Sequence, residues 1–389
     1  MTRDTRRERL SFIDATRRSL RRLDRAIQRR TARIFTLNIA LWFLFFFVVY
    51  LILLFKVNTY ETLGDHFFFG LYSVIITGYI LSRFLLANFH KQVDVDLSYE
   101  PTVTFVVPAK NEESNIAETI ERFAEVDYPK EKIEVIAIND GSTDRTYEEM
   151  LRVAERVRPI VKRVEVVNWI ENRGKRHGMA EGVFRAKHDI VIFIDSDSFI
   201  EPDAVTHLVK YFSDPTVGAV SGHTDVYNAN QNLLTRMQDL RYYISFKVYK
   251  AAESVFGNVT CCPGCCSAYR REYLGEFIDE WLNQRFLGAV CTFGDDRALT
   301  NFILRKYNAV YSPEARAYTV VPDNFPQYVK QQQRWKKSWV RETLLASTFM
   351  WRRNSLAAFF FYVYVILAFA APIVFIRAVF FLPLTKSQR

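Results

Sequence analysis

The chain has 389 residues, enough for two or three domains, and aromatic residues make up 15% of it. Its formal charge of +9 is uneven, because residues 1–33 hold twelve arginines and four acids and the remainder is nearly neutral. Such a basic arm is either a solvated tail or a segment that binds anionic lipid headgroups. Nucleic-acid binding is disfavoured, because an apolar segment follows the arm and few aromatic residues interleave its arginines.

Three apolar segments are candidates for membrane helices. Residues 34–55 are long enough to cross a ~30 Å hydrocarbon core as a helix, and residues 67–89 and 356–382 are further candidates. The arginines before the first segment predict a cytoplasmic N-terminus, so two crossings return the chain to the cytosol. The predicted organisation is a basic arm at 1–33, two transmembrane helices at 34–89, a cytosolic domain with interfacial helices at 90–345, and a C-terminal transmembrane helix at 346–389.

From residue 101 onward, short apolar runs alternate with helical segments. The predicted strands are 102–107, 133–138, 161–167, 189–197 and 217–221, and the predicted helices are 113–125, 146–156, 174–187 and a segment from Asp203. This alternation predicts a three-layer α/β domain on a mostly parallel sheet. The five cysteines, four of them in residues 261–266, indicate a reducing compartment, and their spacing does not match a structural zinc site.

Two long segments have a different pattern. In residues 230–256 apolar side chains recur at spacings of three and four, which predicts one helix with a single apolar stripe. That stripe packs either on the domain core or, alternatively, on a membrane surface. Residues 328–351 carry three tryptophans among lysines and arginines just before the last apolar segment, which is typical of an interfacial segment.

A pair of acids ends the apolar run at residues 189–197. In α/β sheets ligands bind at the carboxyl ends of strands, and side chains two residues apart on a strand point the same way. Asp195 and Asp197 therefore either face one hard divalent cation, Mg²⁺ or Mn²⁺, or form a solvated strand end.

Three further polar clusters follow predicted strands or open predicted helices. Asp140 follows a strand and either belongs to an ordinary turn or accepts hydrogen bonds from a base or sugar. Lys175 follows a glycine at a helix start, where it suits a phosphate or a solvated cap. Asp295 and Asp296 open another helix, either as capping acids or with one of them as a general base near a phosphate ester.

A last cluster, Gln331-Gln332-Gln333-Arg334-Trp335, precedes the final apolar segment. Its arginine can hold a pyrophosphate, and its tryptophan can stack on a sugar face. Each cluster by itself is weak evidence for a binding or catalytic site. The occurrence of all of them in this order is a far more specific signal.

This order of motifs resembles that of processive, membrane-embedded family-2 glycosyltransferases, and among them the hyaluronan synthases most. The resemblance covers about residues 100–345. The segments that carry it are 107–112, 140–142, 172–176, 195–197, 284–288, 291–301 and 331–342.

The resemblance implies a GT-A domain flanked by transmembrane helices, with Mg²⁺ or Mn²⁺ and a UDP-sugar donor such as UDP-GlcNAc, with UDP-GlcUA as a second candidate. It implies metal binding by Asp197 and Asp195, with Asp296 as the base and Asp295 as the second choice. Trp335 would stack on the growing polysaccharide. The residues implied in nucleotide-sugar binding are Pro108, Ala109, Glu112, Asp140, Lys175, Asp195, Gln331 and Arg334. The reaction would be a single inverting displacement that elongates a β-linked aminosugar polymer at the plasma membrane.

Two departures from the family leave alternatives open. The acceptor-side loop reads Pro263-Gly264-Cys265-Cys266 where the family has Gly-Gly-Pro-Leu or similar, which leaves the acceptor undetermined. The family carries several membrane helices after the Arg-Trp pair, and one is predicted here. Either the chain is short, or several copies join as a homo-oligomer to form a channel, or no long polymer is translocated. The alternatives are a chitin-like poly-GlcNAc synthase, a non-processive transferase to a lipid carrier, and an inactive membrane scaffold.

Overall fold

A computed structural model describes residues 47, 50, 54, 67–93 and 99–381. The predicted basic arm and nearly all of the first predicted membrane helix lie outside these residues. The chain divides into two units, Met1–Leu81 and Ser82–Arg389, and the candidate site belongs entirely to the second.

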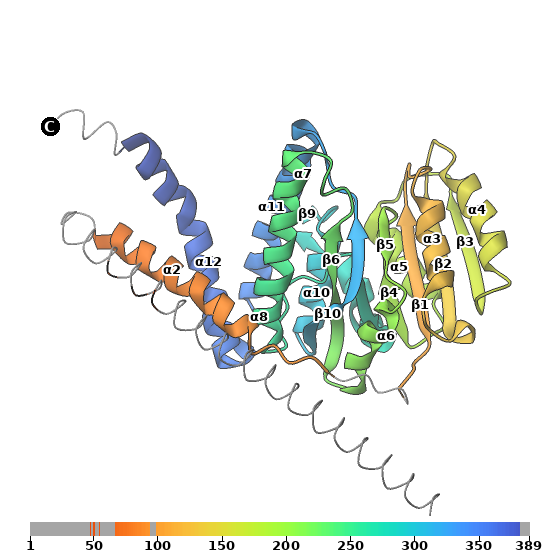
Figure 1. Cartoon of the computed structure of the whole chain (residues 1–389), viewed down its shortest axis with the longest axis horizontal. Helices are drawn as coiled ribbons and strands as arrows, with labels where there is room; N and C mark the ends of the chain where they lie inside the picture. Colours follow the sequence, from red (N-terminus) through yellow and green to blue (C-terminus); the bar gives the residue numbers. More distant parts are fainter. Residues whose placement is uncertain (1–46, 48–49, 51–53, 55–66, 94–98, 382–389) are drawn as a thin grey trace, which may run out of the picture. The chain divides into compact units, whose positions relative to one another are not determined.

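The second unit is built on one mixed sheet. Its strands are β1 (Val103–Ala109), β2 (Ile133–Asp140), β3 (Arg163–Trp169), β4 (Ile190–Phe193), β5 (Ser198–Ile200), β6 (Val217–Val226), β7 (Ser267–Arg270) and β10 (Asn308–Thr319). They form an eight-stranded sheet in the order β3-β2-β1-β4-β7-β6-β10-β5 (Figure 1). β3, β2, β1 and β4 run parallel, as do β6 and β10, whereas β7 and β5 are antiparallel to their neighbours. β8 (Arg285–Phe286) and β9 (Ala289–Val290) form a separate hairpin.

Helices cover both faces of this sheet. The helices that pack on it are α3 (Ile116–Glu125), α4 (Thr146–Val157), α5 (Lys175–Arg185), α6 (Ala204–Val209), α7 (Leu233–Tyr243), the π-helical segment η3 (Ile244–Lys250), α8 (Ala251–Ser254), α9 (Arg271–Leu282) and α10 (Asp295–Leu304). α11 (Phe325–Ser347) packs on α10, and the other long helices are α2 (Phe67–Ala87) and α12 (Ser355–Ile376).

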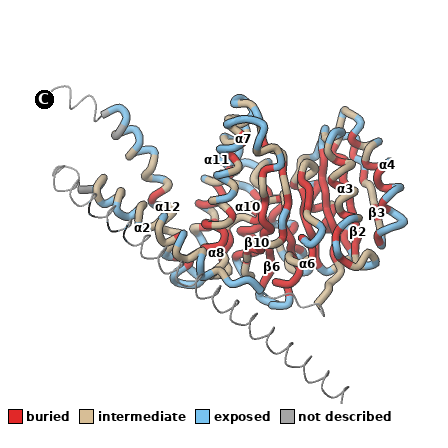
Figure 2. The backbone as a smooth tube through the Cα atoms, viewed as in Figure 1, coloured by how far each residue is buried: buried red, intermediate tan, exposed pale blue. Residues whose placement is uncertain are grey.

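Two apolar cores lie on opposite sides of the sheet, because neighbouring side chains of a strand point to opposite faces. In β1, Phe105 and Val107 belong to the core formed with α3, α4 and α6, whereas Val106 belongs to the core formed with α5, α9 and α10. Figure 2 shows the buried residues concentrated in the strands between these helices. The predicted three-layer α/β architecture is confirmed, with antiparallel strands added to the parallel half.

The segment that ends in the acid pair differs from its prediction. β4 ends at Phe193, and Asp195 and Asp197 lie in the short connection to β5, where the Ser198 amide donates to the Asp195 carbonyl at 3.0 Å. The prediction that both acids lie on a strand is therefore wrong. The reason is that β5 must reverse direction to pair with β10, so the chain turns at these residues.

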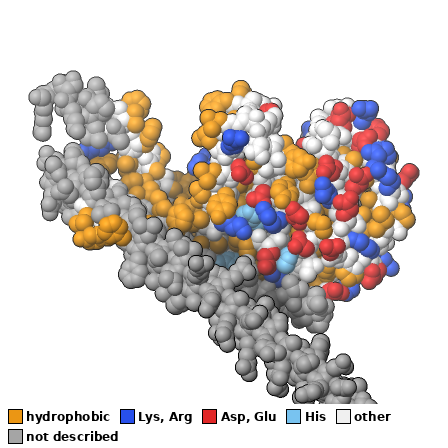
Figure 3. Space-filling model, in the orientation of Figure 1, with side chains coloured by type: hydrophobic (Ala, Val, Ile, Leu, Met, Phe, Trp, Pro, Cys, Tyr) orange, Lys and Arg blue, Asp and Glu red, His pale blue; other side chains and the backbone are white. Residues whose placement is uncertain are grey.

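The single apolar stripe predicted for residues 230–256 is also wrong. The winding changes from α-helical in α7 to π-helical in η3, which shifts the register of every later side chain. Leu233, Met237 and Leu240 are consequently 74%, 63% and 60% exposed, whereas Val248 and Ala251 are buried. The second half of the segment packs on the domain core, as one of the two predicted alternatives had it. The first half, α7, instead has an exposed apolar surface (Figure 3).

Two of the described helices are long and apolar enough to cross a membrane. They span Phe68–Ala87 in α2 and Ser355–Ile376 in α12. Both coincide in position with the apolar segments predicted at 67–89 and 356–382.

Candidate active site

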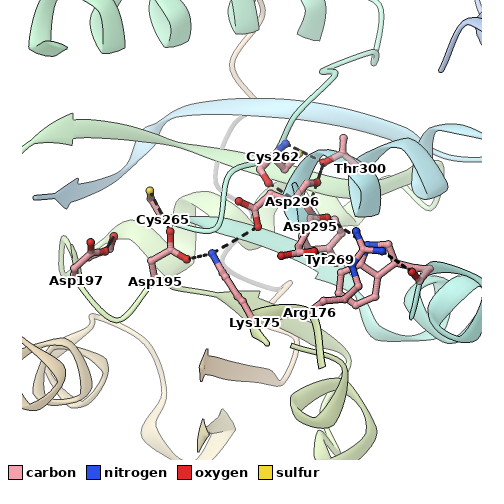
Figure 4. A network of polar contacts seen from close by, with 12 residues as sticks. Lys175, Arg176, Asp195, Asp197, Cys262, Cys265, Tyr269, Asp295, Asp296 and Thr300 are labelled. Atoms are coloured by element: carbon pink, nitrogen blue, oxygen red, sulfur yellow. Dashed lines mark hydrogen bonds and ion pairs between the residues drawn. The ribbon is translucent and has the colours of Figure 1, made fainter. Parts of the chain in front are cut away.

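Three predicted residues from distant parts of the chain meet at the carboxyl edge of the parallel strands. Asp195 follows β4, Lys175 is the first residue of α5, and Asp296 lies in the first turn of α10. The Lys175 Nζ atom is 2.5 Å from Asp195 Oδ1 and 3.9 Å from Asp296 Oδ1. Figure 4 shows the lysine side chain reaching between the two carboxylates. Burial alone would lower the pKa of Lys175, but Asp195 and Asp296 raise it above its ordinary value, so the amine is charged.

Asp197 lies beside this cluster in surroundings that disfavour its charged form, although Lys175 opposes this effect. Burial, followed by the charges of Asp195 and Glu112, raises the pKa of Asp197 to about 7. Burial likewise raises the pKa of Glu112, and the nearby Asp144 and Asp195 add to it. A divalent cation would relieve this repulsion, and carboxylate oxygens are suitable ligands for Mg²⁺ or Mn²⁺. The described part of the chain contains no group of three or more His, Cys, Asp or Glu residues that could hold a metal ion.

The second acidic group of the cluster, Asp296, has a carboxylate oxygen available to accept a proton. Its Oδ1 atom is buried and has no hydrogen-bond partner. Burial raises the pKa of Asp296, and Asp195 and Asp295 add to this, while Lys175 opposes it. A carboxylate with a raised pKa in reach of a substrate hydroxyl is suited to general-base chemistry.

Asp295 has a different environment from Asp296, although the two residues are adjacent in the chain. Its Oδ1 atom accepts a hydrogen bond from Arg176 Nε at 2.7 Å, and the exposed fractions of the two side chains are 8% and 4%. Arg176 is also bonded through Nη1 to the Trp281 carbonyl at 2.9 Å. The Asp295 carboxylate is thus engaged in a buried ion pair (Figure 4), which leaves Asp296 as the better placed of the two predicted bases.

The loop of residues 261–266 closes over the cluster. A Cβ atom on Gly264 would lie 2.5 Å from Asp195 Oδ1 and 2.9 Å from Lys175 Nζ, so only glycine allows this approach. The Cys265 thiol donates to Asp195 Oδ2 at 3.6 Å. Burial raises the pKa of Cys265, as do Asp195 and Asp197, so the thiol stays protonated. All five cysteines are free, and in this loop Cys262 and Cys266 are buried while Cys261 and Cys265 are half-buried.

Comparisons with known proteins identify the family of the chain. The family model for glycosyl transferase family 2 matches residues 104–278. A hyaluronan synthase of Streptococcus pyogenes is 35% identical over 279 residues, which cover 71% of this chain and 66% of the synthase. This chain belongs to the family-2 glycosyltransferases.

Other relatives have related chemistry. An N-acetylglucosaminyltransferase of Rhizobium meliloti is 34% identical over 290 residues, which cover 71% of this chain and 66% of the relative. A solved mannosyltransferase from Pyrobaculum calidifontis, in complex with GDP-mannose and Mn²⁺, has a TM-score of 0.60 and 25% identity, and the match covers 79% of this chain and 83% of that chain. The chain spans just under two thirds of the length of the curated relatives it matches first. The family model and the match to the mannosyltransferase structure confirm the predicted GT-A fold.

In this glycosyltransferase Asp140 supports the start of α5. It ends β2, and its carboxylate accepts hydrogen bonds from the amides of Arg173 at 2.6 Å and Gly174 at 2.9 Å. The neighbouring strand β1 ends with Pro108 and Ala109, which pair with the last residues of β2. Asp140 thus holds the turn that presents Lys175, and the ends of the two strands lie together at the same edge.

The predicted Gln-Arg-Trp residues lie apart from the acids. Gln331, Arg334 and Trp335 are on α11, where Arg334 is exposed and Trp335 is 37% exposed. Within the described part of the chain, no hydrogen bond or ion pair joins them to Lys175 or to the acidic cluster. Their predicted contacts with nucleotide and acceptor remain predictions.

Four residues at the site had no role in the predictions made from the sequence. Arg176 lies in the segment 172–176 that carries the resemblance, but no role was predicted for it, and it is the partner of Asp295. Gly264 and Cys265 gave no signal beyond a loop of small residues. Burial raises the pKa of Tyr242 of α7 well above its ordinary value, and Cys265, Asp197 and Asp195 add to this.

Proposed function

We propose that the chain is a membrane-bound inverting glycosyltransferase that uses UDP-sugars to elongate a β-linked aminosugar polysaccharide, most like a hyaluronan synthase. The observation that carries the proposal is the meeting of Lys175, Asp195 and Asp296 within 4 Å at the edge of a GT-A sheet. The similarity to proteins named hyaluronan synthase and N-acetylglucosaminyltransferase supports an aminosugar donor.

A divalent cation is the proposed cofactor. Asp197 and Asp195 would hold it, and the mannosyltransferase of similar fold, in complex with Mn²⁺ and GDP-mannose, supports this assignment. Such an ion supplies charge to the diphosphate leaving group. The raised pKa of Asp197, caused by burial and by its acidic neighbours, is the property expected of a carboxylate whose counter-charge is a bound cation.

The donor would lie across the ends of β1, β2 and β4. In this assignment Lys175 provides a fixed positive charge for the diphosphate, and Gln331 and Arg334 of α11 close over the nucleotide. Arginine is suited to this task because its guanidinium forms paired hydrogen bonds with phosphate oxygens. The residues proposed to line the uridine side are Pro108, Ala109, Glu112 and Asp140.

Transfer would then need a base that removes a proton and a side chain that holds the sugar to which the new unit is added. Asp296 would remove the proton of the attacking hydroxyl, since its Oδ1 atom is buried and without a hydrogen-bond partner. Trp335 would stack on the terminal sugar and direct that hydroxyl towards the anomeric carbon. The inversion of configuration follows from a single displacement.

The apolar surfaces support a location at the plasma membrane, with the catalytic domain cytosolic. α12 has the length and composition of a membrane span, and the exposed Leu233, Met237 and Leu240 of α7 give an interfacial surface. Lipids are thus proposed partners, together with the growing polysaccharide. A homo-oligomer remains part of the proposal as one way to build a channel for a long product.

The decisive experiment is a donor panel with the full chain purified in lipid nanodiscs and supplied with Mn²⁺. UDP release and incorporation would be measured with UDP-GlcNAc, UDP-GlcUA, both together, and GDP-mannose as a control. Incorporation that requires both UDP-sugars would support a hyaluronan product, whereas incorporation of GlcNAc alone would support a chitin-like one. A lipid-extractable product with one sugar would replace the proposal with a non-processive transferase. No UDP release from either UDP-sugar would refute it.

A further inference from the structure

A buried chain of polar contacts runs from the predicted active site to α11. Arg176, which binds Asp295, also donates from Nη1 to Gln284 Oε1 at 3.1 Å. Gln284 Nε2 donates to Glu342 Oε1 at 3.2 Å, and Arg341 Nε donates to the same oxygen at 2.7 Å. All five side chains belong to residues that are at most 8% exposed.

A second set of contacts joins α11 to α10 directly. Asn301 Nδ2 of α10 donates to the Glu342 carbonyl at 3.0 Å and to its Oε2 atom at 3.2 Å. A Cβ atom on Gly294, the residue before α10, would lie 1.8 Å from Ser338 Oγ. Arg341 also donates to the carbonyl of Phe293. α11 is therefore held against the backbone that immediately precedes Asp295 and Asp296.

The contacts hold the helix through charged groups. Two arginines and two acids balance one another in two ion pairs, and the exposed fraction of each side chain is at most 8%. Apolar residues would attach a helix at least as strongly, because the desolvation of charges offsets much of their attraction. A network of directed hydrogen bonds, by contrast, permits only one axial and rotational position of the helix.

That position determines where the predicted acceptor residue lies. Trp335, Ser338 and Glu342 are three and four residues apart, so they share one face of α11. Trp335 is two helical turns from Glu342, roughly 10 Å along the axis. Any slip of α11 against Gly294 would move Trp335 relative to Asp296.

We infer that Arg176, Gln284, Arg341 and Glu342 are positioning residues that hold α11, and with it Trp335, in register with Asp296. This rests on the proposed function, in which Trp335 orients the acceptor and Asp296 removes its proton. Transfer to a sugar acceptor requires that register. Hydrolysis of the donor by water requires only the donor site and the base.

The test compares transfer with hydrolysis in the same reaction. In Glu342→Gln, an NH₂ donor replaces an oxygen that now accepts from other donors, so the network cannot close. The full chain is given labelled UDP-GlcNAc, with UDP-GlcUA where the wild type needs it, and polymer-bound and free GlcNAc are measured. The ratio of transferred to free GlcNAc is expected to fall by on the order of ten- to a hundredfold, as small misplacements of reacting groups do. The KM for UDP-GlcNAc is expected to stay within about twofold of the wild type.

Two further variants keep the result interpretable. Gln284→Met removes the bridge but leaves both ion pairs intact, and it is expected to lower the same ratio even if Glu342→Gln does not fold. Glu280→Gln, which makes the same change in an exposed pair with Arg305, is expected to leave the ratio unchanged. A ratio equal to that of the wild type in a folded Glu342→Gln or Gln284→Met variant would overturn the inference, because a merely structural role lowers both products together. A wild-type chain that releases no UDP would overturn the proposed function, and this inference with it.

Discussion

Aspartate-to-asparagine substitution is expected to have different effects at the two adjacent acids at the start of α10. At Asp296 it should lower kcat, and at Asp295 it should lower stability. Asp296→Asn removes the proposed proton acceptor, and loss of a general base typically lowers kcat about 10²- to 10⁴-fold. Its thermal stability is expected to be equal to or higher than that of the wild type. The sign follows from the raised pKa of Asp296, which means that burial and Asp195 disfavour the charged form that the substitution removes.

Asp295→Asn should act mainly on stability. It leaves the Arg176 guanidinium, 4% exposed and 2.7 Å from the substituted group, without its counter-charge. Removal of one partner of a buried ion pair costs about 3–5 kcal/mol. At about 2–4 °C per kcal/mol for a domain of this size, Tm should fall by roughly 6–20 °C. The kcat per folded molecule should fall less than in Asp296→Asn.

The assay measures UDP release for kcat and KM, and intrinsic fluorescence during heating for Tm, on both variants in the same detergent. The pH profile adds a check: the wild-type rate should decline as the pH falls through the pKa of Asp296, which lies above the ordinary value for an aspartate because of burial. If Asp296→Asn kept its kcat within about tenfold of the wild type while a folded Asp295→Asn lost it, the assignment of the base would have to be exchanged.

Three other changes test separate parts of the structure. Gly264→Ala places a methyl group 2.5 Å from Asp195 Oδ1 and should lower kcat/KM for the donor by at least about tenfold. The control Gly275→Ala, where a Cβ atom would have no atom within 4 Å, should leave kcat/KM unchanged. Equal kcat/KM values in the two variants would contradict the close approach of Gly264 to Asp195. Chelation of divalent ions should abolish UDP release, and the Mn²⁺ concentration for half activity should rise as the pH falls below about 7, where Asp197 becomes protonated; a requirement independent of pH would exclude Asp197 as a ligand. Asp225→Asn tests how stability depends on the protonation of Asp225. Burial raises the pKa of Asp225, but His223 and Arg316 lower it to about 2. The carboxylate then contributes about 2 kcal/mol above pH 4, so the Tm difference between variant and wild type should shrink as the pH falls from about 4 to about 2.

The local pattern predicted the parallel half of the fold because its signals are short-range. Strands and helices alternate from 103 to 185, and the carboxyl ends of such strands meet at one edge. That rule predicted that Asp195 lies at the ligand-binding edge of the sheet, whereas a place for Lys175 beside the donor was implied only by the resemblance. Asp296 was added by the order of motifs, and the structure places it within the same cluster.

The parts that were not predicted depend on contacts between distant residues. The short strand β7 carries no signal of its own and is inserted between β4 and β6 only in three dimensions. The partner of Asp295 is Arg176, 119 residues away, and nothing near either residue indicates the pairing. The apolar spacing around Ile244 was read with the period of an α-helix, whereas the chain there winds as a π-helix and divides the stripe between the core and the surface.

The position of β5 has a consequence for biosynthesis. β5 directly follows Asp197 and pairs only with β10, whose matching residues are made about 120 residues later. At a translation rate of about 5–20 residues per second, roughly 6–24 s pass between the synthesis of the acids and that of the strand that fixes them. During that interval the edge at β5 is open to pairing with other chains. The turn that carries Asp195 and Asp197 can therefore take its final paired form only after the chain has been synthesised as far as Thr319.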